Sequence, residues 1–363
     1  CLLSRGLGDV YKRQHLNMIQ YNQGNFGKSC LNGGTAMNVK NKLLYALANA
    51  GNEYISGAAL AAQLGVSRNA VWKAVKALNA EGYGIESAPS RGYRLTSDNN
   101  RLAAEFITPF LRTNALGRVM SVYSEIDSTN SRAKELASEG AVHGTTVVAD
   151  MQSAGRGRLG RAFVSPSGKG LYMSVIIRPD YSTETASLIT SATACAAAEA
   201  VENLCGSEVR IKWVNDLYMH GKKICGILTE ASLGLEMRTL DYAVIGIGVN
   251  VRKIGESFDS DLSMRATSIE DVTDLKLNRN ELCAEILNCL EKYLDSLEER
   301  GFLAEYRRRE LLTGNLITAN IGGETITAKA VGIDDNANLI AELPDGSTRH
   351  LGSGEANLCR IKT

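Results

Sequence analysis

Apolar residues recur at helical spacing early in the chain. In residues 39–49, Leu43, Leu44 and Leu47 would share one face of a helix. Two further helical patterns follow, each preceded by a serine, Ser56 or Ser67, that can cap the first turn. Two short strands complete this region. The predicted elements are a helix at 39–49, an extended piece at 53–55, helices at 57–64 and 68–80, and strands at 84–88 and 92–96.

This order of elements is that of a winged helix-turn-helix, a DNA-binding fold whose second motif helix enters the major groove. Val71, Val75 and Leu78 form the apolar stripe of that helix, and its opposite side is polar. Solvated charges on a small helical domain are the alternative interpretation. The residues predicted to contact DNA are Ser67, Arg68 and Asn69 at bases, Lys73 and Lys76 at phosphates, Trp72 beside them, and Arg91 and Arg94 on the hairpin.

Beyond a polar linker at 97–100, strands and helices alternate along the chain. Strands are predicted at 118–125, 145–151, 171–177, 209–213, 223–231 and 242–249, and helices at 129–138, 184–204 and 279–299. This mixture predicts an α+β body built around one sheet. From residue 315 onward, short strands broken by turns predict a small β-barrel or sandwich. The predicted domains are therefore 37–97, 101–312 and 315–363.

Length and composition agree with several globular domains. A chain of 363 residues can form two or three domains with sizeable cores, and 44% hydrophobic with 22% charged residues is ordinary for soluble protein. No apolar run is long enough to span a bilayer, and the N-terminus has no secretory signal. The eight cysteines contain no Cys-x-x-Cys pair, so we expect neither a disulfide framework nor a zinc site. Together these features predict a cytoplasmic protein.

Residues 1–36 lack hydrophobic periodicity. The stretch from 22 to 35 is rich in Gly and Asn, and a patterned helix begins only after Met37. We therefore interpret residues 1–36 as a disordered or non-native extension and Met37 as the native start.

The formal net charge of zero conceals an uneven distribution. Residues 37–97 hold seven Lys and Arg against three Asp and Glu, a balance of +4. Residues 98–363 hold 29 Lys and Arg against 36 Asp and Glu, a balance of −7. A basic module on an acidic body predicts a polyanionic partner at one end of the molecule only.

A loop at residues 155–161 combines three glycines with three arginines. Glycines let a backbone approach a ligand closely, and arginines supply planar cationic donors for phosphates and carboxylates. The glycine spacing also fits the dinucleotide fingerprint, which requires a helix to open at the last glycine. Residues 162–170 instead predict a loop and 171–177 a strand, so a Rossmann site is excluded. A surface loop with solvated arginines is the remaining alternative to an anion site.

Four motifs place polar groups at strand ends. They are Asp-Ser-Thr-Asn at 127–130, Gln-Ser-Ala-Gly-Arg-Gly-Arg at 152–158, Lys-Trp-Val-Asn-Asp-Leu at 212–217 and Gly-Ile-Gly-Val-Asn at 246–250. In sequence, order and spacing this set resembles the biotin–protein ligases. With the winged helix in front, the chain resembles their bifunctional form, which is also a biotin-responsive repressor. The resemblance covers residues 39–362, and Val214 stands where the family usually has proline.

The resemblance implies a fold and a reaction. The central domain would be a mixed-sheet α/β ligase domain of the biotin/lipoate ligase type, followed by a small SH3-like β-barrel. The activity would be that of a biotin–[acetyl-CoA-carboxylase] ligase, which joins biotin to ATP with Mg²⁺ and transfers it to a lysine. The implied partners are a biotin carboxyl carrier protein or carrier domain, operator DNA and a second copy of the chain, without a membrane.

The resemblance also implies roles for individual residues. Because two anions must be brought together, the protein supplies positioning and positive charge rather than a nucleophile. The implied catalytic residues are Lys212, which would bridge the biotin carboxylate and the α-phosphate, Arg158 and Arg156. The implied biotin-binding residues are Ser128, Thr129, Asn130, Gln152, Arg156, Gly157, Arg158 and Lys212. The implied nucleotide-binding residues are Arg156, Arg158, Arg161, Lys212, Asn215, Asp216 and Asn250, and no side chain is assigned as a metal ligand.

Three other functions fit parts of this pattern. The winged helix could be inert, which leaves a ligase alone. The body could bind a metabolite without turnover, which makes the chain a ligand-sensing transcription factor. A lipoate-type ligase has a related fold, but the Gly/Arg loop and the Lys-Trp motif favour biotin.

Overall fold

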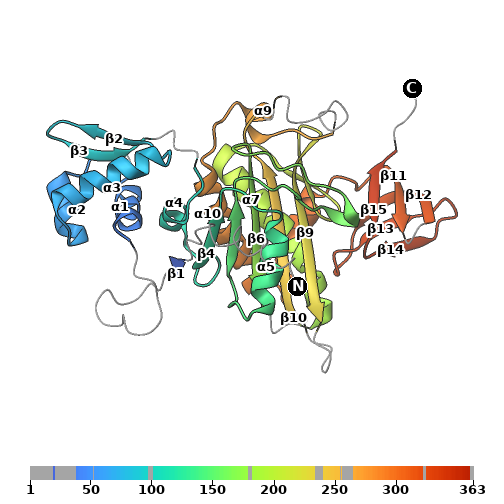
Figure 1. Cartoon of the computed structure of the whole chain (residues 1–363). Helices are drawn as coiled ribbons and strands as arrows, with labels where there is room; N and C mark the ends of the chain where they lie inside the picture. The colour runs from blue at the N-terminus through green and yellow to red at the C-terminus, as the bar shows by residue number, and fades with distance from the viewer. Residues whose placement is uncertain are drawn as a thin grey trace, which may run out of the picture.

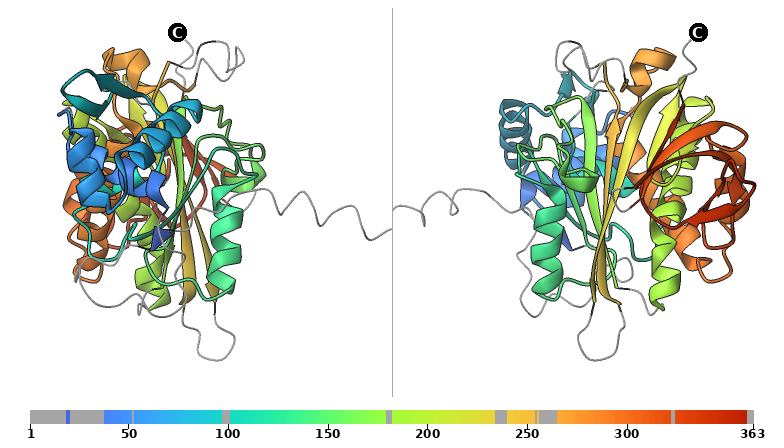
Figure 2. Two further views of the ribbon diagram at one scale, coloured as in Figure 1. Left: turned by 60° about the vertical axis from the view of Figure 1, so that its left-hand side comes forward. Right: turned by 90° about the vertical axis from the view of Figure 1, so that its right-hand side faces the viewer.

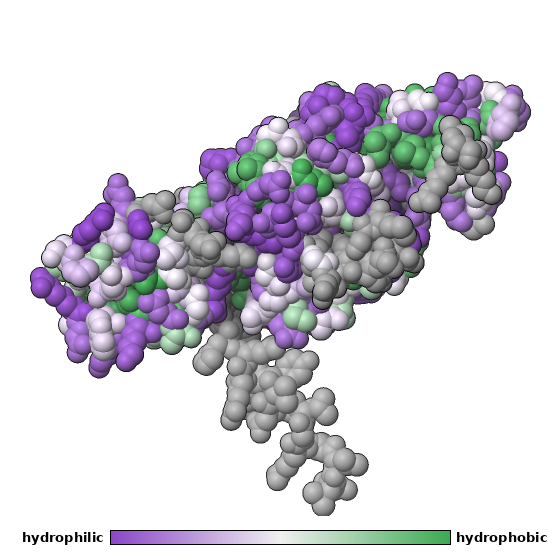
Figure 3. All heavy atoms as spheres, turned by 90° about the horizontal axis from the view of Figure 1, so that it is seen from above, coloured by the Kyte–Doolittle hydropathy of each residue, from purple (hydrophilic) through white to green (hydrophobic). Residues whose placement is uncertain are grey.

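The computed structural model describes residues 19–20, 38–51, 53–96, 101–178, 182–233, 240–253, 255, 265–321 and 324–359. Three bodies follow one another: a helical N-terminal domain, a central sheet flanked by helices, and a C-terminal β domain (Figure 1). Seen from above, the molecule is elongated and its surface is largely hydrophilic (Figure 3). Within the described ranges, no helix combines the length and apolar character needed to cross a membrane.

The N-terminal domain has the predicted order of three helices and a β-hairpin. Ser56 and Ser67 cap its second and third helices, and Gly65 ends the second in a left-handed conformation that suits glycine. Ile55 pairs with Tyr93 and joins the extended piece to the hairpin. The predicted order is therefore confirmed. The elements are α1 (Val39–Asn49), α2 (Gly57–Leu64), α3 (Arg68–Ala80), β2 (Ile85–Ala88) and β3 (Gly92–Leu95).

The central domain is built on one eight-stranded sheet. Its strands lie in the order β1-β4-β5-β6-β10-β9-β8-β7, and β4 and β5 run parallel while the other described pairs are antiparallel. The predicted mixed sheet is thus confirmed. The strands are β1 (Ile19–Gln20), β4 (Val119–Tyr123), β5 (Thr146–Ala149), β6 (Gly170–Ile177), β7 (Arg210–Lys212), β8 (Asp216–Met219), β9 (Lys222–Leu233) and β10 (Leu240–Asn250).

Helices cover both faces of this sheet (Figure 2). On one face, Val147 and Ile176 meet the buried side chains of α5. On the other, Val148 and Ile245 belong to the same core as α7 and α10. Val147 and Val148 reach opposite faces because successive side chains of a strand point in opposite directions. The helices are α4 (Ala104–Ile107), α5 (Thr129–Ser138), α6 (Thr183–Ser187), α7 (Ile189–Cys205), α9 (Ile269–Thr273), α10 (Arg279–Asp295) and α11 (Leu303–Arg309).

The structure differs from the sequence prediction at several short elements. The pattern misses β8, because apolar and polar positions alternate there over only four residues. The helix predicted at 184–204 is two helices, α6 and α7, that meet at Leu188. Helix α10 ends at Asp295 rather than at 299, and α4, α9 and α11 are missed. Elements of one or two turns offer too few periods to be recognised from hydrophobicity alone.

Helix α4 lies between the N-terminal and central domains (Figure 1). Ala103 and Phe106 belong to the apolar core of the N-terminal domain, where the Phe106 ring meets Tyr83 edge to face at 5.6 Å. Ala104 and Ile107 belong to the core of the central domain. Since neighbouring positions of one short helix serve two cores, packing continues across the domain boundary.

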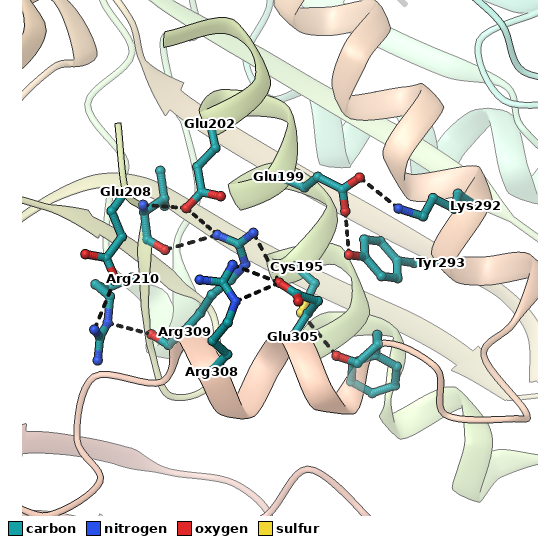
Figure 4. A network of polar contacts seen from close by, with 12 residues as sticks. Cys195, Glu199, Glu202, Glu208, Arg210, Lys292, Tyr293, Glu305, Arg308 and Arg309 are labelled. Atoms are coloured by element: carbon teal, nitrogen blue, oxygen red, sulfur yellow. Dashed lines mark hydrogen bonds and ion pairs between the residues drawn. The ribbon is translucent and has the colours of Figure 1, made fainter. Parts of the chain in front are cut away.

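A polar network joins α7, α10 and α11 (Figure 4). Glu199 of α7 accepts hydrogen bonds from Lys292 Nζ at 2.8 Å and from Tyr293 OH at 2.5 Å, both on α10. Burial and the Glu199 carboxylate raise the pKa of Tyr293 well above its usual value. Glu202, farther along α7, pairs with the buried guanidinium of Arg309 on α11. The network therefore ties the three helices to one another.

The C-terminal domain is a five-stranded antiparallel sheet with the order β14-β13-β12-β11-β15. The predicted module of short strands is thus confirmed, and its closure into an SH3-like barrel stays a prediction. The strands are β11 (Leu316–Ile321), β12 (Glu324–Ile333), β13 (Leu339–Glu342), β14 (Thr348–Leu351) and β15 (Glu355–Leu358).

The interpretation of residues 1–36 as an extension falls almost wholly outside the described residues. Within that segment, Ile19–Gln20 form the edge strand β1 and pair with Val119 and Met120 of β4. The linker predicted at 97–100 and the last residues, 360–363, also lie outside the described part. The interpretation of residues 1–36 therefore stays a prediction.

Candidate active site

A cavity of about 510 Å³ opens between the Gly/Arg loop at 155–161, the floor formed by β9 and β10, and the turn before β15. The four sequence motifs all contribute to its lining, although they lie far apart along the chain. The structure therefore brings together every residue predicted to contact biotin or nucleotide. These residues are Ser128, Thr129, Asn130, Gln152, Arg156, Gly157, Arg158, Arg161, Lys212, Asn215, Asp216 and Asn250.

The Gly/Arg loop is held by its own backbone. Gly157 N donates to Arg161 O at 2.8 Å, and Phe163 N donates to Gly155 O at 2.9 Å. A side chain at Gly155 would collide with Phe163 O, because an added Cβ would lie 2.3 Å from it. The loop contains one short 3₁₀ turn and then leads into β6 without the helix of the dinucleotide fingerprint. The exclusion of a Rossmann site is therefore confirmed.

One end of the cavity is polar but uncharged. Gln152 Oε1 accepts hydrogen bonds from Thr129 N at 2.8 Å and Thr129 Oγ1 at 3.1 Å. Gln152 Nε2 donates to Ser165 Oγ at 2.9 Å, which fixes the orientation of the amide. Ser128 caps α5 by accepting from Ser131 N at 3.4 Å. Such an end can orient a neutral group that has both donors and acceptors.

Asn130 is fixed at both ends of its amide. Its Nδ2 donates to Glu230 Oε2 at 2.9 Å, and its Oδ1 accepts from Ser174 Oγ at 2.6 Å. Lys134 Nζ lies 2.8 Å from Glu230 Oε1. Burial alone would raise the pKa of Glu230, but Lys134 and Asn130 together lower it. The glutamate therefore acts as an ionised acceptor that holds Asn130 in place.

Glycines of β10 form the floor beside Asn130. A Cβ at Gly246 would lie 2.1 Å from Asn130 Oδ1, and a Cβ at Gly248 would lie 2.6 Å from the Phe163 ring. Both distances are shorter than real contacts allow. The glycines thus leave room for neighbouring side chains and for a ligand. Phe163 is a cavity residue that the motifs do not identify, since a lone aromatic residue in a loop carries no distinguishing pattern.

The other end of the cavity is cationic and reaches the C-terminal domain. Arg158 Nη1 donates to Asn215 Oδ1 at 2.9 Å, and its Nη2 donates to Gly354 O at 3.1 Å. Lys212 Nζ donates to Asn357 Oδ1 at 2.5 Å. These contacts join residues far apart in sequence. No local pattern in the sequence marks Gly354, Glu355 or Asn357 as cavity residues.

Lys223 is a second cavity lysine that the motifs do not identify. Its Nζ lies 2.6 Å from Asp216 Oδ1, and it faces the floor at Gly226. Its backbone is held on both sides, because Lys223 N donates to Arg265 O at 3.0 Å and Thr267 N donates to Lys223 O at 2.9 Å. No local pattern in the sequence marks Lys223 as a cavity residue, because its contacts with Asp216 and Gly226 exist only in the folded chain.

Burial and neighbouring cations disfavour the charged form of Lys212 at the cationic end. Burial lowers the pKa of Lys212, and the neighbouring charges of Lys223 and Arg161 add to this effect, while Asp216 and Glu355 oppose it. Burial also raises the pKa of Tyr218, whose ring lies 5.9 Å from Lys212 Nζ, to about 12. An incoming anion would therefore be attracted by cations that are only partly compensated.

The residues of the cationic end fit a nucleotide-borne Mg²⁺. Across the described residues, no group of three or more His, Cys, Asp and Glu side chains could hold a metal alone. Mg²⁺ commonly needs only one or two carboxylates when phosphates supply other oxygens. Asp216, with Asn215 and Asn250 nearby in the lining, meets that need.

The predicted DNA contacts gather at the N-terminal domain, on α3 and the hairpin. Trp72 is 50% exposed, and Lys76 Nζ lies 5.5 Å from the centre of its ring. Ser67 Oγ caps α3 by accepting from Ala70 N at 3.2 Å, so this oxygen is already engaged. The predicted contact residues of this helix and its N-cap are all exposed: Ser67, Arg68, Asn69, Trp72, Lys73 and Lys76.

The two hairpin arginines lie together on Tyr54. The guanidinium carbons of Arg91 and Arg94 lie 4.3 and 4.7 Å from the centre of its ring. Arg94 Nε also lies 2.9 Å from Glu86 Oε2, which partly neutralises it. Because Arg94 is paired with Glu86, Arg91 is the better placed of the two arginines to bind a phosphate.

A mixed sheet that carries a cationic, glycine-floored cavity and follows a winged helix defines a class of bifunctional protein. Its members join a DNA-binding domain to an α/β enzyme that gathers anionic substrates. Comparison with known families agrees domain by domain. The HTH domain matches residues 39–94, the biotin/lipoate A/B protein ligase family matches 122–250, and the biotin protein ligase C terminal domain matches 314–358.

Full-length relatives support the same assignment. The chain is 36% identical to the bifunctional ligase/repressor BirA of Bacillus subtilis (strain 168) over 311 residues, which is 85% of this chain and 95% of the relative. It is 32% identical to that of Escherichia coli (strain K12) over 328 residues, which is 87% and 96%. The solved biotin protein ligase from Aquifex aeolicus in complex with biotin and ATP is 28% identical, with a TM-score of 0.57 over 67% of this chain and 99% of that chain. The chain belongs to the biotin protein ligase family, in its bifunctional ligase/repressor form.

Proposed function

We propose that this protein activates biotin with ATP, transfers it to a lysine of a carboxylase carrier domain, and represses transcription in response to biotin. One observation carries the enzymatic part: a single cavity has an uncharged hydrogen-bonding end and a cationic end. Biotin has a neutral ureido ring and a carboxylate, so it matches both ends. ATP brings the second anion to the cationic end.

The uncharged end would hold the ureido ring. Thr129, Asn130 and Gln152 offer amide and hydroxyl groups whose orientations are already fixed by their neighbours. Pre-oriented groups lose little freedom when a ligand binds. Ser128, Gly157 and the arginines of the loop would surround the rest of biotin.

The cationic end would bring the two acids together. In the first step, a biotin carboxylate oxygen attacks the α-phosphorus of ATP, the bond to the β-phosphate oxygen breaks, and pyrophosphate leaves. Arg156, Arg158 and Lys212 would neutralise both reactants and the developing charge, and Lys223 adds a further cation at the floor. Arg161, Asn215, Asp216 and Asn250 would contact the nucleotide. Bound Mg²⁺ would supply charge neutralisation on the phosphates.

In the second step, the acceptor lysine amine attacks the carbonyl carbon of biotinyl-5′-AMP. An amide bond forms, the bond from carbonyl carbon to phosphate oxygen breaks, AMP leaves, and the amine loses a proton. The cavity walls would protect the mixed anhydride from water until the acceptor arrives. No side chain needs to form a covalent intermediate.

The winged helix would bind operator DNA. Exposed polar and cationic residues on α3 and the hairpin support this role, as does the +4 balance of residues 37–97. We propose that biotinyl-5′-AMP favours a homodimer that pairs two winged helices on a two-fold operator. We also propose a cytoplasmic location and domain limits at 37–97, 101–312 and 315–363.

The enzymatic proposal is tested by pyrophosphate release from purified protein given biotin and ATP, with lipoate as the competing acid. Release with biotin only, and loss of release in Arg158→Ala and Lys212→Ala, is the expected result. A carrier-domain peptide incubated with the same mixture should gain the mass of one biotinyl group. Ligand binding without pyrophosphate release would identify a sensor rather than a ligase.

The repressor proposal is tested by gel shift on the promoter of the biotin operon of the source organism. Biotin with ATP should tighten binding several-fold, and affinity should fall steeply with salt because phosphate contacts release counterions. Absence of salt-dependent binding would leave a ligase with an inert winged helix.

A further inference from the structure

Two neighbouring residues begin helix α10, and both are almost fully buried. Arg279 and Asn280 are each 2% exposed. A cation at a helix N-terminus opposes the helix dipole, and burial removes its hydration. The stability of α10 alone therefore does not explain an arginine at this position. The contacts of Arg279 with Gly170 and Asp150 explain it.

Arg279 holds the turn that precedes β6. Its Nη1 donates to Gly170 O at 2.7 Å and lies 2.7 Å from Asp150 Oδ1. Asp150 Oδ2 in turn accepts from Gly168 N at 3.1 Å and from the hydroxyl of Ser167. One guanidinium thus joins the end of β5 to residues 167–170.

This turn forms part of the frame of the cavity. Lys169 O accepts from Val251 N at 3.1 Å and from Arg252 N at 2.8 Å, directly after the cavity residue Asn250. Asp150 stands two residues before Gln152, which also lines the cavity. Arg279 therefore positions two edges of the cavity without lining it itself.

Asn280 holds the chain that leads from the winged helix. Its Oδ1 accepts from Ala103 N at 3.2 Å, and its Nδ2 donates to Arg101 O at 2.9 Å. Arg101 also contacts the N-terminal domain, because it donates to Glu81 O and its guanidinium carbon lies 4.4 Å from the centre of the Tyr83 ring. One amide thus ties α10 to the boundary of the DNA-binding domain.

We propose that the first turn of α10 couples the ligand cavity to the winged helix. Arg279 positions the cavity edge and Asn280 positions the segment 101–107, so the two act as adjacent positioning residues on one rigid turn. A ligand that restricts the motion of the cavity edge then also restricts the motion of residues 101–107 at the junction with the winged helix. By linkage, a constraint on the junction changes ligand affinity by the same factor. This inference rests on the proposed function, since biotin and ATP are its ligands.

The full chain offers a matched control on the same helix. Asn288 also uses both ends of its amide on the preceding segment: Arg112 N donates to its Oδ1 at 2.7 Å, and its Nδ2 donates to Phe110 O at 3.1 Å. It lies more than two turns from Arg279 and has no contact with the turn at 167–170 among those described. Asn288 Nδ2 also donates to Glu285 Oε2 at 3.3 Å, on the same helix. Asn288→Ala therefore removes similar hydrogen bonds to the neighbouring segment, and this further one, without touching the proposed junction.

The test is hydrogen exchange of residues 101–107 in the full-length protein, with and without biotin plus ATP. In wild type and in Asn288→Ala, ligands should slow exchange about fivefold or more, the lower end of ordinary coupling. In Asn280→Ala the ligand effect should fall below about twofold, with kcat for pyrophosphate release unchanged. Asn280→Asp, which keeps the acceptor for Ala103 N, should show an intermediate effect even if the alanine variant is unstable.

Arg279 is tested by a second readout. Arg279→Met should raise the KM for biotin about tenfold, as the loss of one charge-assisted contact would, and Arg279→Lys should recover part of it. Arg309→Met breaks a similarly buried pair in the network of Figure 4 and should lower Tm without this change in KM.

Equal ligand effects in Asn280→Ala and wild type would overturn the inference, as would an equal loss in Asn288→Ala. A wild-type protein that releases pyrophosphate but shows no ligand effect at 101–107 would overturn the inference alone. A wild-type protein that releases no pyrophosphate would overturn the proposed function together with it.

Discussion

Arg161 and Glu355 form a two-pronged ion pair that closes one side of the cavity. Arg161 Nη1 lies 3.0 Å from Glu355 Oε1, and Nη2 lies 2.6 Å from Oε2. The hydrogen bonds from Arg161 lower the pKa of Glu355 below its usual value. The pair joins the Gly/Arg loop to the C-terminal domain, so this domain takes part in shaping the cavity rather than only following it in the chain.

Glu355→Gln should therefore weaken nucleotide binding more than it weakens the fold. A released Arg161 must be immobilised again when ATP binds, which costs about 0.5–1.5 kcal/mol and raises the KM for ATP roughly three- to tenfold. An exposed ion pair stabilises a fold by only about 0.2–1 kcal/mol, so Tm should hardly change. Initial rates of pyrophosphate release and a thermal melt measure both quantities.

The pair between Arg349 and Glu324, with atoms 3.2 Å apart in the same domain, is the matched control. Glu324→Gln should leave the KM for ATP unchanged. If it raised this KM as much as Glu355→Gln does, the closure of the cavity by Arg161 would not be the cause.

Lys212 and Lys223 are expected to have separable roles. Lys223 Nζ stands beside Asp216 at the floor, whereas Lys212 Nζ is bound to Asn357 at the C-terminal side. Lys212→Met should lower kcat for adenylation by about 10²–10³-fold, the usual cost of removing a donor aimed at developing charge. Lys223→Met should act more strongly on the KM for ATP. Steady-state kinetics of pyrophosphate release distinguish the two effects.

Lys222 supplies the control for this comparison, because it carries the same charge next to Lys223 but does not line the cavity. Lys222→Met should keep kcat and KM near wild type. Equal kinetic profiles for all three variants would mean that only the overall charge of the region matters.

The glycine floor predicts a specific defect for Gly246→Ala. The new Cβ would lie 2.1 Å from Asn130 Oδ1, so the amide must move away from Ser174 and Glu230. The loss of at least one buried hydrogen bond, worth about 1–3 kcal/mol, should raise the KM for biotin tenfold or more. Isothermal titration with biotin measures the same change directly.

Gly301→Ala is the corresponding control outside the cavity, since its nearest new contact is Ser296 Oγ at 3.3 Å. It should bind biotin as wild type does. A Gly246→Ala protein with unchanged biotin affinity would show that Asn130 does not contact biotin.

Local signals in the sequence predict the local structure well. Ser128 caps α5, and the helix covers the predicted residues 129–138, because a cap and its helix lie within a few positions of each other. The motifs also predict the cavity lining, since each motif stands at the end of its strand. Partners that lie far apart in the sequence cannot be predicted in this way. Glu355 lies 194 residues after Arg161, and nothing in the pattern around either residue indicates the other.

The same limit explains which cavity residues have no recognisable signal in the sequence. Phe163 and Lys223 become recognisable only when β9 and β10 lie side by side beneath the Gly/Arg loop. In the sequence, nothing distinguishes Arg279 from an ordinary charged residue in the first turn of a helix. Its burial depends on the contact with Asp150, which directly follows β5. Tertiary packing, rather than propensity, determines these roles.

Glu105 predicts how stability depends on pH at the junction of the two domains. It lies in α4 and is 4% exposed. Burial raises its pKa above the usual 4.5, although its own backbone N–H and Arg101 partly oppose the shift. A raised carboxyl pKa in the folded state means that ionisation opposes folding. Its contribution to stability is fully present below the ordinary pKa and is lost as pH rises through the higher folded value.

Glu105→Gln should therefore raise Tm at pH 8, by about 2–4 °C for each kcal/mol gained in a body of this size, and change it little at pH 4. Glu285 of α10 offers the opposite case. Burial alone would raise its pKa, but hydrogen bonds from Asn203, Arg112 and Asn288 lower it overall. Glu285→Gln should thus lower Tm at pH 8 and have less effect as pH falls. Calorimetry of both variants at the two pH values checks the sign, and a loss of Tm at pH 8 in Glu105→Gln would show that the carboxylate is stabilised in the fold rather than disfavoured by burial.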